Sequence, residues 1–195
     1  MTLYPLDKMV RLFDALAGGW GADFERPTTK SIKHINQHFG IELPASLVEF
    51  AYRSEHFSTW FGGLGEDYAN PMHIIRVTSH YRNKRRRKHG DKWRRAMPRQ
   101  YIVINHGHDD DCDCIDTADW NAETSEFRLG YWCPGMDTLE FRQDSFLHYI
   151  NRYVLDWARG CLKYKDREGK TGMRAREKFD MVTRILGQGW GNQGG

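Results

Sequence analysis

The residue types best suited to chemistry gather between Tyr101 and Asp116, where the sequence reads YIVINHGHDDDCDCID. A short apolar run leads here into two histidines, two cysteines and five aspartates. Imidazole and thiolate groups are ligands that zinc prefers, whereas a row of carboxylates attracts positively charged partners. The stretch is therefore open to two functional interpretations, a metal site and an acidic recognition surface.

The metal interpretation rests on imidazole and thiol donors, namely His106, His108, Cys112 and Cys114, with Cys133 as a further donor. Zinc binds four such donors in a tetrahedron. The spacing H-x-H-x3-C-x-C differs from the usual zinc patterns, because two cysteines that are two residues apart on a strand point to one face without a turn between them. We favour the alternative of two small buried thiols on one face, with Ile115 on the other, and expect no bound cofactor.

A thiol nucleophile with its base would use the same residues, Cys112 or Cys114 with His106 or His108. A thiol becomes reactive where a base or a positive field favours the thiolate. The surrounding aspartates have the opposite effect, because negative charge raises the pKa of a thiol. We therefore expect no catalytic residue here and no enzyme.

The acidic interpretation uses the carboxylates of Asp109, Asp110, Asp111, Asp113 and Asp116. A negative patch of this kind complements the basic cleft of a nucleic-acid-binding protein and raises the rate and specificity of association. Asp116 differs from the others because it lies within a strand, where a buried carboxylate needs hydrogen-bond partners. The alternative is an acidic hairpin turn that serves solubility alone.

Aromatic residues add two candidates for partner binding, Trp60 and Trp132, because each lies in a loop or near a strand edge. Tryptophan and tyrosine are enriched in binding hot spots. Most of the other large rings are expected in the core, where such residues are usually buried. The candidate partner-binding set is thus the five aspartates with these two tryptophans.

Charge is unevenly distributed along the 195 residues, whose net charge is +3. The segment 83–95 carries +7 and the segment 163–178 carries +4, which leaves −8 for the remainder. The first basic segment contains Trp93 and so has the composition of a nucleic-acid-binding stretch. An acidic remainder repels the same phosphate backbone, so a solvated helix is the simpler interpretation, and nucleic acid is not the partner that we favour.

Length and composition limit the class of protein. With 39% apolar residues, the chain can bury one sizeable core. It contains no apolar run long enough to span a membrane, and its first residues do not resemble a signal peptide, so we expect a cytoplasmic protein that does not bind membranes. Its four cysteines are expected to stay reduced.

Apolar periodicity predicts helices near both ends of the chain and strands between them. Helices are predicted over residues 6–16, 28–39 and roughly 173–186. A further helix is predicted to start at Pro44, with Tyr52 on its inward face. Another is predicted to run from an N-cap at Asp144 to Cys161. Strands are predicted over 101–105, 112–117 and 126–133, which is typical of an antiparallel meander. Residues 72–78 are interpreted as a short strand or buried linker, and the basic run after them as a helix.

Three motifs occur in an order that resembles the SUKH superfamily. The segment IELPASLVEFAYRSEHF contains an LP-x-x-L-x-x-F helix like that of the family, and YIVINHGHDDDCDCID resembles its central hairpin, with a C-x-D element at Cys114-Ile115-Asp116. EFRLGYWC and then DSFLHYINRYVLDW resemble its last strand and closing helix, which starts at Ser145-Phe146. The resemblance covers roughly residues 28–162.

The resemblance implies an α+β fold, with a mainly antiparallel sheet and central meander covered by N- and C-terminal helices. It divides the chain into an N-terminal helical extension (1–27), a SUKH-like domain (28–162), and a basic C-terminal helix with a glycine-rich tail (163–195). For function it implies a bacterial immunity protein that binds a cognate polymorphic toxin, such as a nuclease or deaminase, and occludes it. The alternatives that we keep are a zinc-binding and a nucleic-acid-binding regulatory module.

Overall fold

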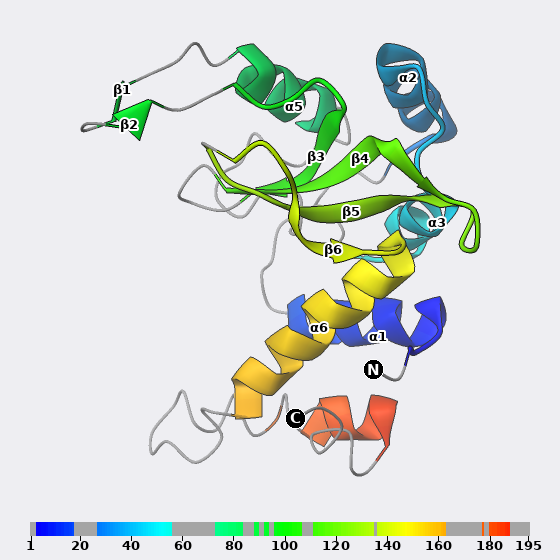
Figure 1. Ribbon diagram of the computed structural model, residues 1–195. Coiled ribbons are helices and arrows are strands. Elements are labelled where there is room, and N and C mark those ends of the chain that lie inside the picture. The colour runs from blue at the N-terminus through cyan, green and yellow to red at the C-terminus, as the bar shows by residue number, and fades with distance from the viewer. Residues whose placement is uncertain are drawn as a thin grey trace.

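A computed structural model describes residues 3–17, 27–55, 73–83, 88–89, 92–93, 96–106, 111–134, 136–162, 177 and 180–187. These residues form the expected α+β fold, in which a four-stranded antiparallel sheet packs against helices (Figure 1). The strands are hydrogen-bonded in the order β3-β4-β5-β6, which is a meander. Within these ranges, no helix has both the length and the apolar character that crossing a membrane requires.

Three helices precede the sheet: α1 (Leu6–Ala17), α2 (Thr29–Phe39) and α3 (Ala45–Arg53). The predicted bounds of α1 and α2 are confirmed to within a residue. α2 begins with a capping box between Thr28 and Ser31 and ends at Gly40. The φ of 69° at Gly40 lies in the left-handed region that favours glycine, which explains why the helix stops there.

Two details of α3 differ from the prediction. Pro44 is the N-cap rather than the first helical residue, because its ψ of 129° is extended. Tyr52 is 38% exposed rather than inward. Leu47, Phe50 and Ala51 already fill the buried face, and the next residue along a helix is turned away from that face.

Residues 73–83 form helix α5 (His73–Asn83), so the interpretation of residues 72–78 as a strand or buried linker is wrong. The buried residues of α5 recur at helical spacing: His73, Ile74, Val77, Thr78 and Tyr81. β-branched residues favour a strand locally, but packing of this face against β3 outweighs that preference. Met72 lies outside the described residues.

The basic run after α5 contains two short strands, β1 (Lys88–His89) and β2 (Lys92–Trp93), which pair antiparallel. The prediction of a helix through these four residues is therefore wrong. The sequence between the strands is Gly-Asp, and a two-residue connection with glycine is typical of a β-hairpin. The other residues of the run, between 84 and 95, lie outside the described part of the chain.

The main sheet consists of β3 (Tyr101–His106), β4 (Cys112–Asn121), β5 (Glu126–Trp132) and β6 (Glu140–Gln143). The first three confirm the predicted strands, although β4 continues to Asn121. β6 is not predicted, because its four residues, EFRQ, include one apolar side chain and show no alternation. The register places Ile115 opposite both Ile102 and Leu129, so one face of the sheet carries an apolar stripe.

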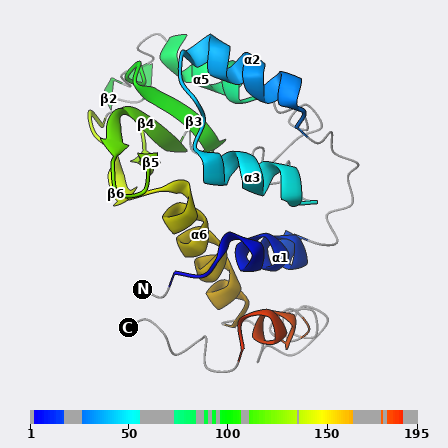
Figure 2. The ribbon, with the colours of Figure 1, turned by 90° about the vertical axis from the view of Figure 1, so that its right-hand side faces the viewer.

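The two faces of the sheet support two apolar clusters. The sheet residues of the main core, which also contains residues of α1, α3 and α6 (Phe146–Leu162), are Ile102, Ile104, Ile115 and Leu129. Those of the second cluster, which packs against α5, are Tyr101, Val103, Cys112, Cys114 and Trp132. Figures 1 and 2 show α5 on one side of the sheet and α1 and α6 on the other. The two cysteines thus share the face opposite Ile115, as expected.

The N-cap of helix α6 is Ser145 rather than the predicted Asp144. The Ser145 carbonyl accepts from the Tyr149 N–H at 3.0 Å, and its Oγ accepts from the His148 N–H at 3.3 Å. Asp144 does not cap the helix, because its carboxylate accepts a hydrogen bond from Arg128 at 3.1 Å. The serine of the Ser145-Phe146 motif is therefore the residue that starts this helix.

Segments near both ends of the chain pack into the same core as α6. The fully buried Asn151 of α6 accepts from the Tyr4 N–H at 2.8 Å and donates to the Tyr4 carbonyl at 3.0 Å. Residues 180–186 are helical and place Val182 in the main core. This confirms the last part of the helix predicted over 173–186, whose first residues, 173–176, lie outside the described ranges.

Candidate functional site

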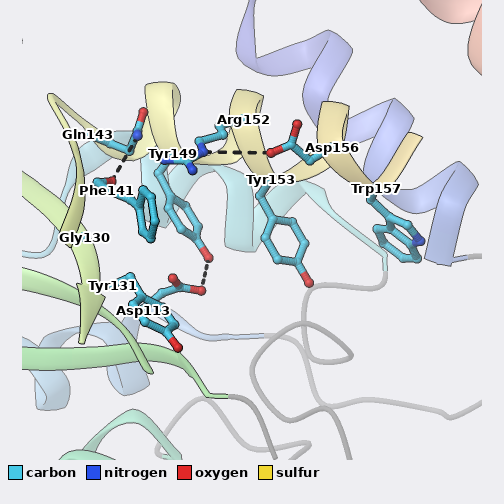
Figure 3. Close-up of a pocket in the computed structure, with 10 residues that line it drawn as sticks. All are labelled: Asp113, Gly130, Tyr131, Phe141, Gln143, Tyr149, Arg152, Tyr153, Asp156 and Trp157. Carbon is cyan, nitrogen blue, oxygen red and sulfur yellow. Dashed lines mark hydrogen bonds and ion pairs between the residues drawn. The ribbon is translucent and has the colours of Figure 1, made fainter. Parts of the chain in front are cut away.

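A pocket of about 380 Å³ lies between α6 and strands β4, β5 and β6 (Figure 3). We call it the Asp113 pocket. It is lined by Asp113, Gly130, Tyr131, Phe141, Gln143, Tyr149, Arg152, Tyr153, Asp156 and Trp157. Half of these residues come from one helix, and half of them are aromatic, so the pocket combines a row of rings with a few charged groups.

The carboxylate of Asp113 lies on the sheet side of the pocket and is half-buried. Its Oδ2 accepts from the Tyr149 hydroxyl at 2.7 Å and from the Asn105 amide at 3.0 Å. Burial raises the pKa of the Asp113 carboxyl, and these hydrogen bonds and the charge of Arg152 only partly offset that effect. Asp113 is thus a carboxylate that the fold holds in place without fully compensating its charge.

Aromatic side chains form the helix side of the pocket. Tyr149, Tyr153 and Trp157 follow each other at four-residue steps on one face of α6 and point the same way in Figure 3. The rings of Tyr149 and Tyr153 are stacked, with their centroids 6.0 Å apart. Burial and then the charge of Asp113 raise the pKa of Tyr153 to about 12, so these phenols stay protonated at neutral pH.

Tyr131 faces these rings from β5, directly opposite Asp113 in the strand register. Its hydroxyl donates a short hydrogen bond to Asp111. Burial, followed by this bond to a carboxylate, raises the pKa of Tyr131 well above its usual range. Tyr131 thus lies opposite Asp113 in the sheet and contacts Asp111, which is not itself a lining residue of the pocket.

Phe141 forms the rim of the pocket on β6. Its side chain is 61% exposed, and its φ of 49° lies in the left-handed region. The ring lies 6.2 Å from the Tyr131 ring and 5.0 Å from the Arg152 guanidinium. Arg152 also lies 3.9 Å from Asp156, so its charge is shared between a ring and a carboxylate.

The structure separates the five aspartates that the sequence groups together. Asp113 lines the pocket, and Asp111 accepts a hydrogen bond from the lining residue Tyr131. Asp116 is only 4% exposed, and its carboxylate pairs with Arg142 at 2.9 Å and accepts from the Ala118 N–H at 3.1 Å. It has the hydrogen-bond partners that its strand position requires, and it offers little surface to a partner. Asp109 and Asp110 lie outside the described residues.

The two tryptophans proposed for partner binding do not meet at the pocket. Trp132 is 1% exposed within the second cluster, and its indole N–H donates to the Met136 carbonyl at 3.0 Å. Trp60 lies outside the described residues. The rings that do line the pocket come from α6, β5 and β6. The rings of α6 recur at the spacing of a core stripe, which predicts a buried helix face and gives no sign of a pocket.

The thiols of the metal interpretation lie inside the second cluster. Cys112 and Cys114 are 1% and 0% exposed, and the Cys114 sulfur is 3.9 Å from that of Met97. Burial raises the pKa of Cys114 well above its usual range, which opposes the thiolate that both zinc binding and nucleophilic attack require. Among the residues that the structure describes, no group of three or more His, Cys, Asp or Glu is placed to hold a metal. The side chains of His106 and His108 lie outside that part.

Comparison with known proteins places the chain in a family. Neither a curated protein nor a solved structure was found to match it. The family model described as the SMI1 / KNR4 family (SUKH-1) matches residues 26–152, which is well over half of the chain and includes α2, α3, α5 and the whole sheet. The chain therefore belongs to the SMI1/KNR4 family (SUKH-1).

Proposed function

We propose that this protein is an immunity protein that binds a cognate bacterial polymorphic toxin and neutralises it by direct occlusion. The observation that carries the proposal is the family match over residues 26–152, because SUKH-1 proteins are known as immunity proteins for polymorphic toxins. Proteins of this superfamily are generally non-catalytic and act by binding. The role places the protein in the cytoplasm of the cell that makes the toxin.

The chemistry of the Asp113 pocket supports binding rather than catalysis. Its lining residues include carboxylates, phenols and one guanidinium, and the phenols stay protonated at neutral pH. The Asp113 Oδ2 accepts from Tyr149 and Asn105, which fixes the carboxylate and leaves Oδ1 to meet a charged partner. Rings around a fixed charge are typical of a recognition site.

Electrostatics favours a toxin that acts on nucleic acid, such as a nuclease or a deaminase. Such enzymes hold phosphates in basic clefts. A negatively charged surface on the immunity protein competes with the phosphates for that cleft and accelerates association. Of the expected acidic set, Asp113 lines the pocket and Asp111 is hydrogen-bonded to its lining residue Tyr131.

Co-expression with the toxin encoded beside this gene tests the proposal. We expect the protein to restore growth and to co-purify with the toxin as a stoichiometric complex. A toxin of the same enzyme class from an unrelated locus is the control, and it should be neither neutralised nor bound. Absence of both rescue and complex with the neighbouring toxin would reject the proposal.

A further inference from the structure

The Asp113 pocket contains a carboxylate that no ion pair in the described part of the chain compensates. Two carboxylates, Asp113 and Asp156, line the pocket. Asp156 lies 2.9 Å from Arg159 and 3.9 Å from Arg152, whereas Asp113 accepts hydrogen bonds from the neutral side chains of Tyr149 and Asn105. Arg152 is the one cation among the described lining residues, and Asp156 and the ring of Phe141 already share its charge. A positively charged group that enters the pocket therefore gains attraction that the fold itself does not supply.

The walls of the pocket suit the same kind of group. Five of its ten lining residues are aromatic: Tyr131, Phe141, Tyr149, Tyr153 and Trp157. Aromatic faces attract cations, and the attraction grows when water is excluded. Acidic and aromatic groups together repel an anion, and a neutral apolar group would bury Asp113 further without compensating its charge.

The backbone at the rim gives an independent indication. Phe141 combines a large exposed ring with a left-handed backbone, a conformation that is strained for any residue with a side chain. Backbone strain of this kind persists where the surrounding structure holds it, and it clusters at ligand sites. Here it sets the Phe141 ring against Arg152 and Tyr131, at the entrance of the pocket.

From these three observations we infer that the Asp113 pocket receives a basic side chain of the protein partner, and that arginine fits it best. Arginine is favoured over lysine because a planar guanidinium stacks on rings and bonds to a carboxylate at the same time. The inference rests on the proposed function in one respect, namely that the partner is a protein toxin. Its chemistry, however, can be tested without a toxin.

Asp113→Asn is the sharpest variant, because it removes the charge and keeps the structure. Both hydrogen bonds from Tyr149 and Asn105 end on Oδ2, and the carbonyl oxygen of asparagine can accept both. The amide nitrogen then replaces Oδ1 and repels a cation. Phe141→Gly removes the ring at the rim in a residue type that tolerates the φ of 49°.

Trp120→Ala is the matched control, because it removes another exposed aromatic ring. Trp120 is 53% exposed, lies on β4 and packs against Phe127, away from the pocket. We expect this change to leave ligand binding within about twofold of the wild type, since distant sites act independently.

An NMR titration of the full chain with N-acetyl-arginine methylamide measures the interaction. Signals of Trp157 and Tyr153 should shift in a saturable manner, Asp113→Asn should weaken binding by about tenfold or more, and Phe141→Gly should weaken it by about threefold. The citrulline analogue, which is neutral but similar in shape, should not bind. Equal binding of citrulline, equal binding by Asp113→Asn, or no saturable shift would overturn the inference. Lysine binding as tight as arginine would overturn the preference for arginine.

A second titration with the cognate toxin separates this inference from the proposed function. If the toxin binds wild-type protein and Asp113→Asn equally well, the proposed function stands and the pocket is not its contact. If the toxin does not bind although blocked arginine does, the pocket chemistry stands and the proposed function fails. Loss of toxin binding in Asp113→Asn, with Trp120→Ala unaffected, supports both.

Discussion

Two carboxylates near opposite ends of the β4–β5 pair have very different surroundings. Glu126 begins β5 and lies opposite Asn121, whereas Asp113 lies near the start of β4, opposite Tyr131. Both contact α6. We call these regions the Glu126 end and the Asp113 end.

At the Glu126 end, the carboxylate is fully used by the fold. Glu126 is 6% exposed and accepts from the Ser46 N–H and hydroxyl, each at 2.8 Å, and from the Phe146 N–H at 3.0 Å. These N–H groups lie in the first turns of α3 and α6, where backbone N–H groups have no acceptor within their own helix. One carboxylate thus joins two helices to the sheet and interacts favourably with both helix dipoles.

At the Asp113 end, the donors are side chains, and the charge remains only partly compensated. The pocket beside it, with its exposed Phe141, is open to a ligand. The comparison shows that a buried carboxylate is a sign of function when the fold leaves its charge uncompensated, and a sign of structure when backbone donors surround it. The β4–β5 pair carries one carboxylate of each kind, Asp113 and Glu126.

Glu126→Ala should have the largest effect on stability. It leaves the buried N–H groups of Ser46 and Phe146 without an acceptor and removes the link between α3 and α6. We expect the free energy of unfolding to fall by about 2–3 kcal/mol, as measured by urea denaturation. Glu123→Ala, in the exposed turn nearby, is the control and should change it by less than about 0.5 kcal/mol. Similar values for the two variants would contradict a structural role for Glu126.

Gly130→Ala should disturb the Asp113 end through its backbone. A Cβ at this position would lie 2.8 Å from the Glu140 carbonyl oxygen and from the Leu139 Cβ, so β6 has to move. We expect a loss of about 1–3 kcal/mol in the free energy of unfolding, together with weaker binding of blocked arginine. Gly160→Ala in α6, where a Cβ would meet nothing within 4 Å, should instead stabilise the protein by about 0.5–1 kcal/mol. An equal change in the unfolding temperature of the two variants would show that β6 does not pack as described.

Phe141→Ala and Phe141→Gly should separate strain from ring contact. Both variants lose the exposed ring, but only glycine relieves the left-handed backbone at residue 141. The glycine variant should therefore be more stable than the alanine variant by about 1 kcal/mol in a thermal unfolding experiment. A more stable alanine variant would mean that this residue does not hold a left-handed conformation in solution.

The sequence predicts most of the fold because apolar periodicity carries the information. The helical spacing of apolar residues predicts α1, α2 and α6. The alternation of side chains along β4 is enough to place Cys112 and Cys114 on the face opposite Ile115. Apolar periodicity gives the wrong prediction for residues 72–78, whose sequence indicates a strand or buried linker. The β-branched side chains of residues 73–78 favour a strand locally, and only the packing of this segment against β3 explains why it is helical.

The candidate site is harder to predict than the fold. The sequence sets Asp116 apart as a strand carboxylate that needs partners, and the structure pairs it with Arg142. No local pattern, however, marks Asp113 among the other aspartates of the motif as the one that lines a pocket. Tyr153 and Trp157 continue the core spacing of Tyr149, but they extend past it along α6 and so become the wall of a pocket. The left-handed backbone of Phe141 has no sequence signal, because neither glycine nor asparagine stands there.

Asp113→Asn should have the smallest effect on stability, and the most informative dependence on pH. Because burial raises the pKa of Asp113 in the folded protein, the folded state holds this proton at pH values where the unfolded chain, with a pKa of about 3.9, has released it. The contribution of the wild-type residue to the free energy of unfolding is therefore greatest below pH ~4, and it falls as the pH rises towards the folded-state pKa. Asparagine does not titrate. Urea unfolding should show similar stabilities near pH 3 and an advantage for the variant of about 0.5–1 kcal/mol at pH 7. An advantage for the wild type that grows with pH would mean that the fold stabilises the Asp113 charge as fully as it does that of Glu126, and the contrast between the two ends would disappear.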